Sequence, residues 1–188
     1  MKKLLAAVVV LFGLGTAANA MDLSNKLEVG GGYAQAIPTT GDVADHVKTS
    51  QYWSLFADYK VLDNVYVGLE YAESNGYDTK HIDNMSSIDS NYFGVRGKYN
   101  VPVTLWGVKG NAYGLLGIAR YRWDTDPHQV SDNGIGTSLG LGLNMDVTEH
   151  IFAGVEGRYH FAPTFDMEEN ESISAEFMTL GVQAGYRF

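Results

Sequence analysis

The residues that most often carry catalysis or bind metals are few in this chain of 188 residues, and they stand apart from one another. There is no cysteine, and His160 is followed by Phe161 and Ala162, so no serine that it could activate comes within two residues of it. Three other histidines lie in separate polar stretches without the close spacing of metal ligands: His46, His81 and His128. No glycine-rich phosphate or dinucleotide fingerprint follows a predicted strand. We therefore expect no catalytic residue, no metal site and no cofactor, with an enzyme and a loop metal site as the alternatives.

A second set of residues could provide ion pairing instead of catalysis. Acidic and basic side chains recur at alternate positions of runs that read as β-strands, which places them on one face of each strand. The predicted network consists of Glu28, Asp58, Lys60, Glu70, Arg96, Lys98, Arg120, Arg122, Glu156, Arg158 and Arg187. Neighbouring strands would place Glu70 opposite Arg96 or Lys98, and Glu156 opposite Arg187. Because a charge in a narrow, poorly hydrated space is costly unless it is paired, we expect these side chains to pair with one another.

The strand that ends the chain shows which face these charges would occupy. Met178, Leu180, Val182, Ala184, Tyr186 and Phe188 alternate with Thr179, Gly181, Gln183, Gly185 and Arg187. One face of this strand is therefore apolar and the other is polar or very small. This pattern predicts a barrel with its apolar face outside, in lipid, and its polar face inside.

Seven further runs with a period of two precede this one. The eight predicted strands are 26–37, 51–61, 64–74, 91–101, 112–123, 135–146, 150–161 and 176–188. Each is long enough for a tilted transmembrane strand, which needs about 9–11 residues. All four prolines (Pro38, Pro102, Pro127 and Pro163) fall between the runs, where a missing backbone donor does no harm.

The predicted connections alternate in length. Long polar stretches at 38–50, 75–90, 124–134 and 162–175 carry formal net charges of −1, −2, −3 and −4. The turns at 62–63 and 147–149 are short, which is the asymmetry of outer-membrane barrels with long loops outside and short turns on the periplasmic side. The remaining connection, 102–111, is longer and apolar, and a turn at 109–111 with a longer fourth strand is an alternative.

Aromatic residues are expected in two belts on the outer face. Those near the loops are Trp53, Tyr71, Phe93, Tyr121, Trp123, Tyr159 and Phe161, and those near the turns are Tyr59, Tyr99, Tyr113, Tyr186 and Phe188. Between the belts we expect aliphatic residues, among them Leu69, Leu115 and Leu141. Two such belts match the two membrane–water interfaces. The alternative is a water-soluble barrel with its apolar face inside.

The ending Gly185-Tyr186-Arg187-Phe188 resembles the carboxy-terminal signal by which outer-membrane proteins are recognised for barrel assembly, with Tyr186 and Phe188 as its aromatic residues. The layout of eight strands is similar to the OmpA-type transmembrane domain and to the small OmpX/Ail-like barrels. The resemblance implies an all-β, eight-stranded, antiparallel up-and-down barrel in the bacterial outer membrane. We expect a monomer without a following peptidoglycan-binding domain, and we expect it to contact the barrel-assembly machinery, membrane lipid and lipopolysaccharide.

Residues 1–20 have the three-part layout of a secretory signal peptide. Lys2 and Lys3 precede an apolar run of twelve residues, and the small residues Ala18 and Ala20 mark a cleavage site after position 20. A retained anchor is the alternative, but the run is shorter than the roughly 20 residues that a spanning helix needs. Loss of both lysines changes the formal net charge from −9 to −11 in the barrel domain, 21–188. Such acidity argues against a nucleic-acid partner.

Two functions fit these expectations. The first is a structural and surface-interaction role, in envelope integrity and in adhesion to a host or surface ligand through the acidic loops. The second is a narrow, porin-like solute channel lined by the same inward charges. An eight-stranded barrel has room only for side chains or for one small ligand, which favours the first function.

Overall fold

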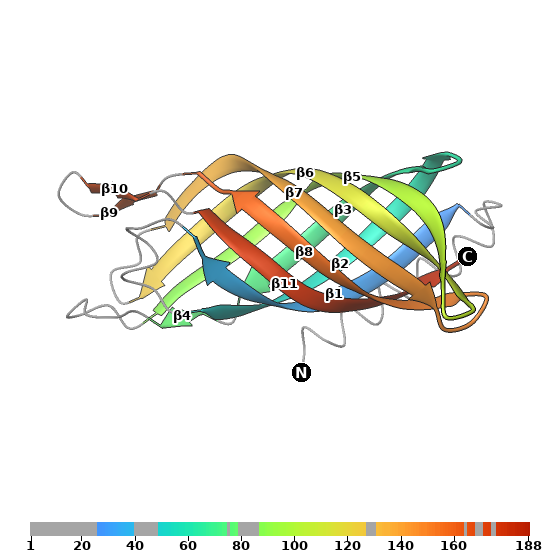
Figure 1. Ribbon diagram of the computed structural model, residues 1–188. Coiled ribbons are helices and arrows are strands. Elements are labelled where there is room, and N and C mark those ends of the chain that lie inside the picture. Colours follow the sequence, from blue (N-terminus) through green and yellow to red (C-terminus); the bar gives the residue numbers. More distant parts are fainter. Residues whose placement is uncertain are drawn as a thin grey trace.

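The first and last long strands lie side by side and close one antiparallel sheet into a barrel (Figure 1). The computed structural model describes residues 26–39, 49–74, 76–78, 87–126, 131–163, 165–167, 171–173 and 176–188. The barrel strands are β1 Leu27–Pro38, β2 Ser50–Leu62, β3 Val65–Ser74, β5 Ser87–Leu105, β6 Val108–Asp126, β7 Ser131–Asp146, β8 Ile151–Phe161 and β11 Glu176–Arg187. Three short strands lie at the loop end: β4 Tyr77–Asp78, β9 Phe165–Met167 and β10 Glu171–Ile173. The predicted signal peptide falls outside the described residues.

Each barrel strand pairs with its neighbours in the chain, and two further contacts complete the circle. β3 pairs directly with β5, and β1 pairs with β11 from Glu28 opposite Arg187 to Pro38 opposite Phe177. This confirms the predicted eight-stranded up-and-down barrel. Within the described ranges, no helix has the length and apolar character needed to cross a membrane.

The hairpin of β5 and β6 is longer than predicted. The expected connection at 102–111 is wrong, and so is the alternative turn at 109–111, because the strands continue to a two-residue turn at Trp106 and Gly107. These residues have φ angles of 51° and 82°. Positive φ at both central residues is the type I′ geometry, whose twist matches that of the flanking strands.

Pro102 therefore lies inside β5, and Pro38 is the last residue of β1, which corrects the expectation that every proline falls between strands. In a hairpin with a two-residue turn, the flanking pair Leu105–Val108 is hydrogen-bonded and the pairs alternate from there. By this alternation the pair of Pro102 and Asn111 exchanges no backbone hydrogen bonds. The nitrogen of Pro102 points to the side of β3, whose pairing with β5 ends at Tyr99, so the missing donor removes no bond.

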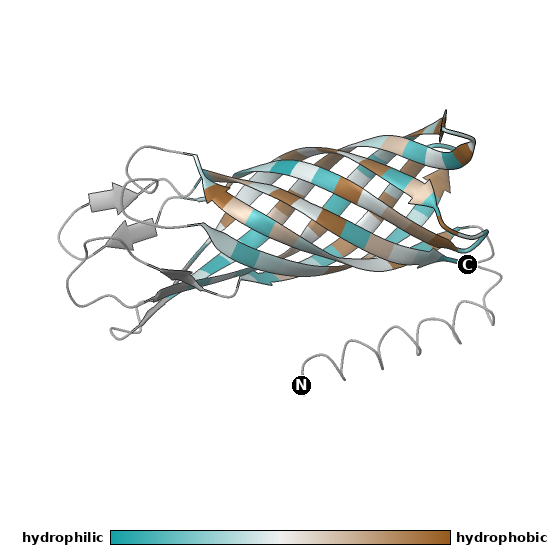
Figure 2. Cartoon of the chain, turned by 60° about the horizontal axis from the view of Figure 1, so that its bottom comes forward, coloured by the Kyte–Doolittle hydropathy of each residue, from teal (hydrophilic) through white to brown (hydrophobic). Residues whose placement is uncertain are grey.

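The outer surface of the barrel is apolar along most strands, and hydrophilic and hydrophobic residues alternate on the ribbon (Figure 2). Leu69 is 51% exposed and Leu141 is 72% exposed, as expected for an outward band. Of the predicted belt residues, Phe93 and Phe161 on the loop side and Tyr59, Tyr99 and Tyr186 on the turn side are exposed.

The predicted faces of β6 are the wrong way round. Tyr113, Leu115, Tyr121 and Trp123 were expected outside and are buried in the bore. Leu116, Ile118, Arg120 and Arg122 lie outside instead. Both faces of this strand carry apolar residues, so its alternation alone does not decide which face points inward. The register with β5 decides it, because Leu115 lies opposite the inward Lys98.

Gly142 on β7 tests how closely the bore is packed. A Cβ atom at this position would come within 2.2 Å of the Tyr113 ring, whereas one at Gly97 on the outer face of β5 would meet nothing within 4 Å. We predict that Gly142→Ala lowers the free energy of unfolding by about 1–3 kcal/mol, because the ring must shift. Urea unfolding of the folded barrel in vesicles measures this change. Gly97→Ala is the matched control, and equal losses in the two variants would contradict the inward packing of Tyr113.

Candidate functional site: the barrel interior

A buried ion cluster occupies the bore between β1, β2 and β5. Arg96 donates two parallel hydrogen bonds to Asp58, from Nε to Oδ1 at 2.7 Å and from Nη2 to Oδ2 at 2.6 Å. Lys98 Nζ lies 3.0 Å from Asp58 Oδ2 and 2.5 Å from Glu28 Oε2. All four side chains are almost fully buried. The two parallel bonds fix the orientation of the guanidinium as well as neutralising it.

The cluster continues across the bore to β3 and β8. Glu70 accepts a hydrogen bond from Arg158 Nη1 at 2.6 Å and lies 3.7 Å from Arg96 Nη1. Arg158 also donates from Nη2 to Glu156 Oε1 at 2.6 Å. Tyr113 donates to the other oxygen of Glu156 at 2.8 Å. Tyr113 was predicted outside. Its inward position gives the second oxygen of Glu156 a hydrogen-bond donor.

At the turn end, Arg187 of β11 joins the cluster to β7. Its Nε donates to Glu28 Oε1 at 2.8 Å, and its Nη1 pairs with Asp146. Asp146 was not among the predicted residues. These ion pairs connect nine side chains in one continuous series, which we call the ion network. In order, its members are Asp146, Arg187, Glu28, Lys98, Asp58, Arg96, Glu70, Arg158 and Glu156.

Three predicted members lie elsewhere. Lys60 is partly exposed and lies 3.8 Å from Asp63 across the β2–β3 turn. Arg120 and Arg122 were predicted inside and are exposed on the outer face, because the two faces of β6 are reversed relative to the prediction. Glu70 lies opposite Gly94 in the register of β3 and β5, and its Oε1 lies 3.7 Å from Nη1 of Arg96, one of the two partners predicted for it.

The predicted opposition of Glu156 and Arg187 is wrong. Glu156 lies opposite Gly181 in the register of β8 and β11, which is six positions along β11 from Arg187. Arg187 instead reaches the acids of β1 and β7 at the turn end of the barrel.

Aromatic rings support the cations in the bore. The Cζ atom of Arg96 lies 3.9 Å from the centroid of Phe56, and that of Arg187 lies 4.8 Å from the centroid of Phe152. A guanidinium over a ring face is attracted by the ring quadrupole, and this attraction is larger away from water.

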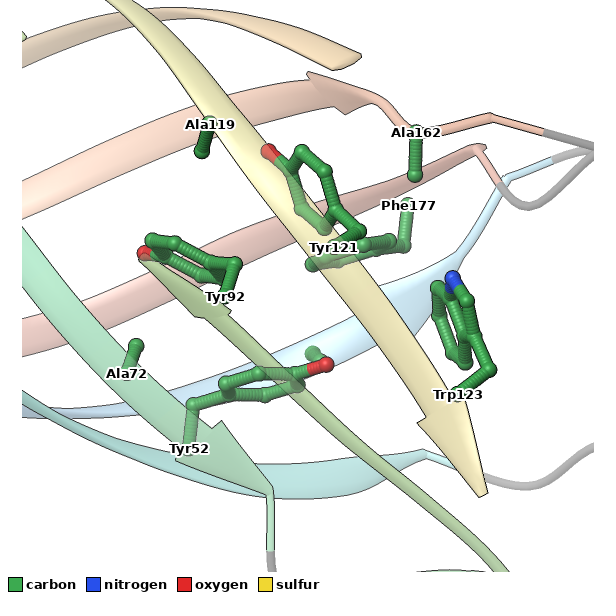
Figure 3. Close-up of a cluster of buried hydrophobic side chains, with 9 residues drawn as sticks. Tyr52, Ala72, Tyr92, Ala119, Tyr121, Trp123, Ala162 and Phe177 are labelled. Atoms are coloured by element: carbon green, nitrogen blue, oxygen red, sulfur yellow. The ribbon is translucent and has the colours of Figure 1, made fainter. Parts of the chain in front are cut away.

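A buried aromatic cluster fills the bore nearer the loops (Figure 3). Its large rings come from five strands: Tyr52, Tyr92, Tyr121, Trp123, His160 and Phe177. His160 stacks on Phe177 with 4.4 Å between ring centroids and an interplanar angle of 7°. Its Nδ1 lies 2.9 Å from the Tyr121 hydroxyl and its Nε2 lies 3.2 Å from Thr179 Oγ1. Both ring nitrogens of His160 therefore have hydrogen-bond partners in the bore.

The alternation of side chains could have located part of this cluster. Tyr52 shares a strand face with Asp58, and Tyr92 shares one with Arg96, so each lies on the inward face of its strand. Tyr121 could not be placed in this way, because the predicted face of β6 was wrong.

Together, the ion network and the aromatic cluster occupy the bore at two levels. This arrangement can hold the strands in a fixed geometry, since its contacts join strands that are distant in the sequence. No group of three or more metal-ligating side chains occurs in the part of the chain that the structure describes. His46, His81 and His128 lie outside the described residues.

Comparisons with known proteins agree with this architecture. The family model of the outer membrane protein beta-barrel domain matches residues 4–188. The solved N-terminal β-barrel domain of Pseudomonas aeruginosa OprF is similar at 17% identity, with a TM-score of 0.58, over 88% of this chain and 98% of that one. Neisserial surface protein A is similar at 15% identity, with a TM-score of 0.59, over 86% and 96% of the two chains.

The attachment invasion locus protein Ail of Yersinia pestis is also similar, at 15% identity with a TM-score of 0.51, over 88% of this chain and 99% of that one. A comparison with curated proteins gave no match. The family match covers nearly the whole chain, and its architecture is the closed, eight-stranded barrel described above. The chain therefore belongs to the outer membrane protein beta-barrel family, and it forms a barrel of the bacterial outer membrane.

Proposed function

We propose that the protein is a sealed, non-catalytic barrel that stabilises the envelope and presents acidic loops to the medium. The observation that carries this proposal is the filling of the bore by the ion network and the aromatic cluster. A charged side chain in such a space is stable only with close partners, and paired side chains leave little room for a solute. A bore that is filled by paired and stacked side chains supports a structural role over a transport role.

The outer face supports the anchoring part of this role. Hydrocarbon cannot satisfy backbone donors and acceptors, so a spanning sheet must close on itself, as this one does. We propose that the cleaved signal peptide exports the chain and that Tyr186 and Phe188 direct its assembly. These two rings lie 4.8 Å apart at the turn end, and Tyr186 is exposed on the outer face, where an assembly partner could contact it.

The charge of the loops supports the surface-interaction part. The four long connections together carry a formal charge of −10, which is most of the −11 expected after cleavage. The similar protein Ail, at 18% identity and a TM-score of 0.50, has been solved in complex with the heparin analogue sucrose octasulfate, a polyanion. The acidic loops of this chain carry the same sign of charge as that ligand, so they favour basic surfaces instead, or divalent cations that link them to lipopolysaccharide.

Conductance separates the sealed barrel from the narrow channel. We predict that the purified protein in planar bilayers gives no stepwise current, because both levels of the bore are occupied. A porin reconstituted in the same way is the positive control. Stepwise currents from correctly folded barrels would overturn the sealed-barrel proposal and establish the channel.

The structural role of the ion network can be measured through Arg96. Arg96→Met removes one of the two cations that contact each of Asp58 and Glu70, and so leaves negative charge in the bore uncompensated. We therefore predict a loss of about 3–5 kcal/mol in the free energy of unfolding. Urea unfolding in vesicles measures this loss. Lys60→Met is the matched control, because the pair of Lys60 and Asp63 is exposed to water, and it should leave the unfolding free energy nearly unchanged. Similar values for both variants would argue against the stiffening role.

The acidic connection between β8 and β11 tests the surface role. Replacing Glu168, Glu169 and Glu171 with glutamine changes its formal charge from −4 to −1. We predict weaker and less salt-dependent binding of the barrel, held in zwitterionic nanodiscs, to a polylysine-coated surface. Glu149→Gln, in the turn at the opposite end, should bind like the wild type. Unchanged binding by the triple variant would remove the loops from the proposal.

A further inference from the structure

Two arginines of β6 lie on the outer face, at the edge of the apolar band. Arg120 is opposite Phe93 of β5 and Ile135 of β7, which are 56% and 76% exposed. Arg122 lies one pleat closer to the loops, about 7 Å along the strand. The level of Arg120 is thus the level of the loop-side aromatic residues, where a membrane interface is expected.

The protein provides only part of the pairing that these two cations need. Arg120 donates from Nη2 to the neutral Asn133 at 2.7 Å, and no carboxylate among the described residues forms an ion pair with it. Arg122 Nε lies 3.0 Å from Asp124 Oδ2 in a pair that is well exposed. An arginine at the edge of hydrocarbon is stable when it finds an anion, and the cost of placing it there falls toward the interface.

Arg120, Arg122, Phe93 and Ile135 form a patch on the outer face, and charges follow one another in a fixed order from this patch toward the loops. The two arginines lie next to the apolar band, while Asp89 and Asp124, which are cross-strand neighbours, lie one step closer to the loops. Guanidinium groups bind phosphate oxygens in the same forked geometry in which they bind carboxylates. The patch therefore matches a ligand whose acyl chains cover Phe93 and Ile135 and whose phosphate reaches Arg120 and Arg122.

We propose that Arg120 and Arg122 form a binding site for a phosphate of the lipid A part of lipopolysaccharide. The choice of this lipid rests on the proposed function, in which the loop end faces outward, so that the leaflet at this level carries phosphorylated glycolipid. Asn133 acts as a positioning residue, because its side-chain oxygen accepts the hydrogen bond from Arg120 Nη2 and so helps to orient the guanidinium.

Native mass spectrometry of the full barrel in zwitterionic detergent tests this site. The probes are bisphosphorylated lipid A, dephosphorylated lipid A and phosphatidylglycerol. The wild type should bind the bisphosphorylated form, and R120Q/R122Q should bind it at least about tenfold more weakly, as expected for loss of charge-assisted contacts. R120K/R122K should retain part of the affinity, because it keeps the charge but loses the fork. Lys109→Gln, in the β5–β6 hairpin at the turn end, is the matched control and should bind like the wild type.

Equal affinity of R120Q/R122Q and the wild type would overturn this site, as would equal binding of phosphorylated and dephosphorylated lipid A. Phosphatidylglycerol bound as tightly as lipid A would overturn the assignment to lipid A. The bore is untouched by these substitutions, so the outcome is independent of conductance. A conducting barrel that binds lipid A through these arginines would overturn the sealed-barrel proposal alone, and a sealed barrel with unchanged affinity in R120Q/R122Q would overturn this inference alone.

Discussion

Pairing of β1 with β11 is the contact on which the rest of the structure depends. Without it the sheet would have two open edges, and neither edge could be satisfied in hydrocarbon. Once the sheet closes, each strand has one face toward lipid and one toward a bore that is too narrow to be left empty. The composition of the inward face then becomes a packing problem as well as an electrostatic one. Glu28 and Arg187 face each other across the closing strands, and their ion pair contributes to the packing of the bore and to its charge balance.

The bore solves this problem with two kinds of filling. Toward the turns, acids and bases alternate so that each charge has an opposite neighbour within a few ångströms. Toward the loops, the rings around His160 and Phe177 fill the space by stacking. Both fillings join strands distant in the sequence, as when Arg158 of β8 contacts Glu70 of β3. A barrel packed in this way is a rigid base for the loops through which we propose that the protein interacts with its surroundings.

The outer face is less uniform than its aliphatic band suggests. On β6 the apolar positions Leu116 and Ile118 give way to Arg120 and Arg122 at the interface. The same strand sends Tyr121 inward to the aromatic cluster. One register thus decides two properties at once, the packing of the bore and the charge that the barrel shows to the surrounding lipid.

The sequence by itself determined the number of strands, their antiparallel order, the apolar outer band and most of the inward charges. These follow from the period of two and from the alternation of short and long connections, which are local properties. Only the tertiary structure decided the face of β6, the turn at Trp106, the entry of Asp146 into the ion network and the partners of Glu156. The physical reason is that both faces of β6 are apolar enough to be either one, so that cross-strand register, a non-local property, makes the choice. Ion pairs across a closed bore likewise depend on which strands the curvature brings together, and no spacing along one chain segment contains that information.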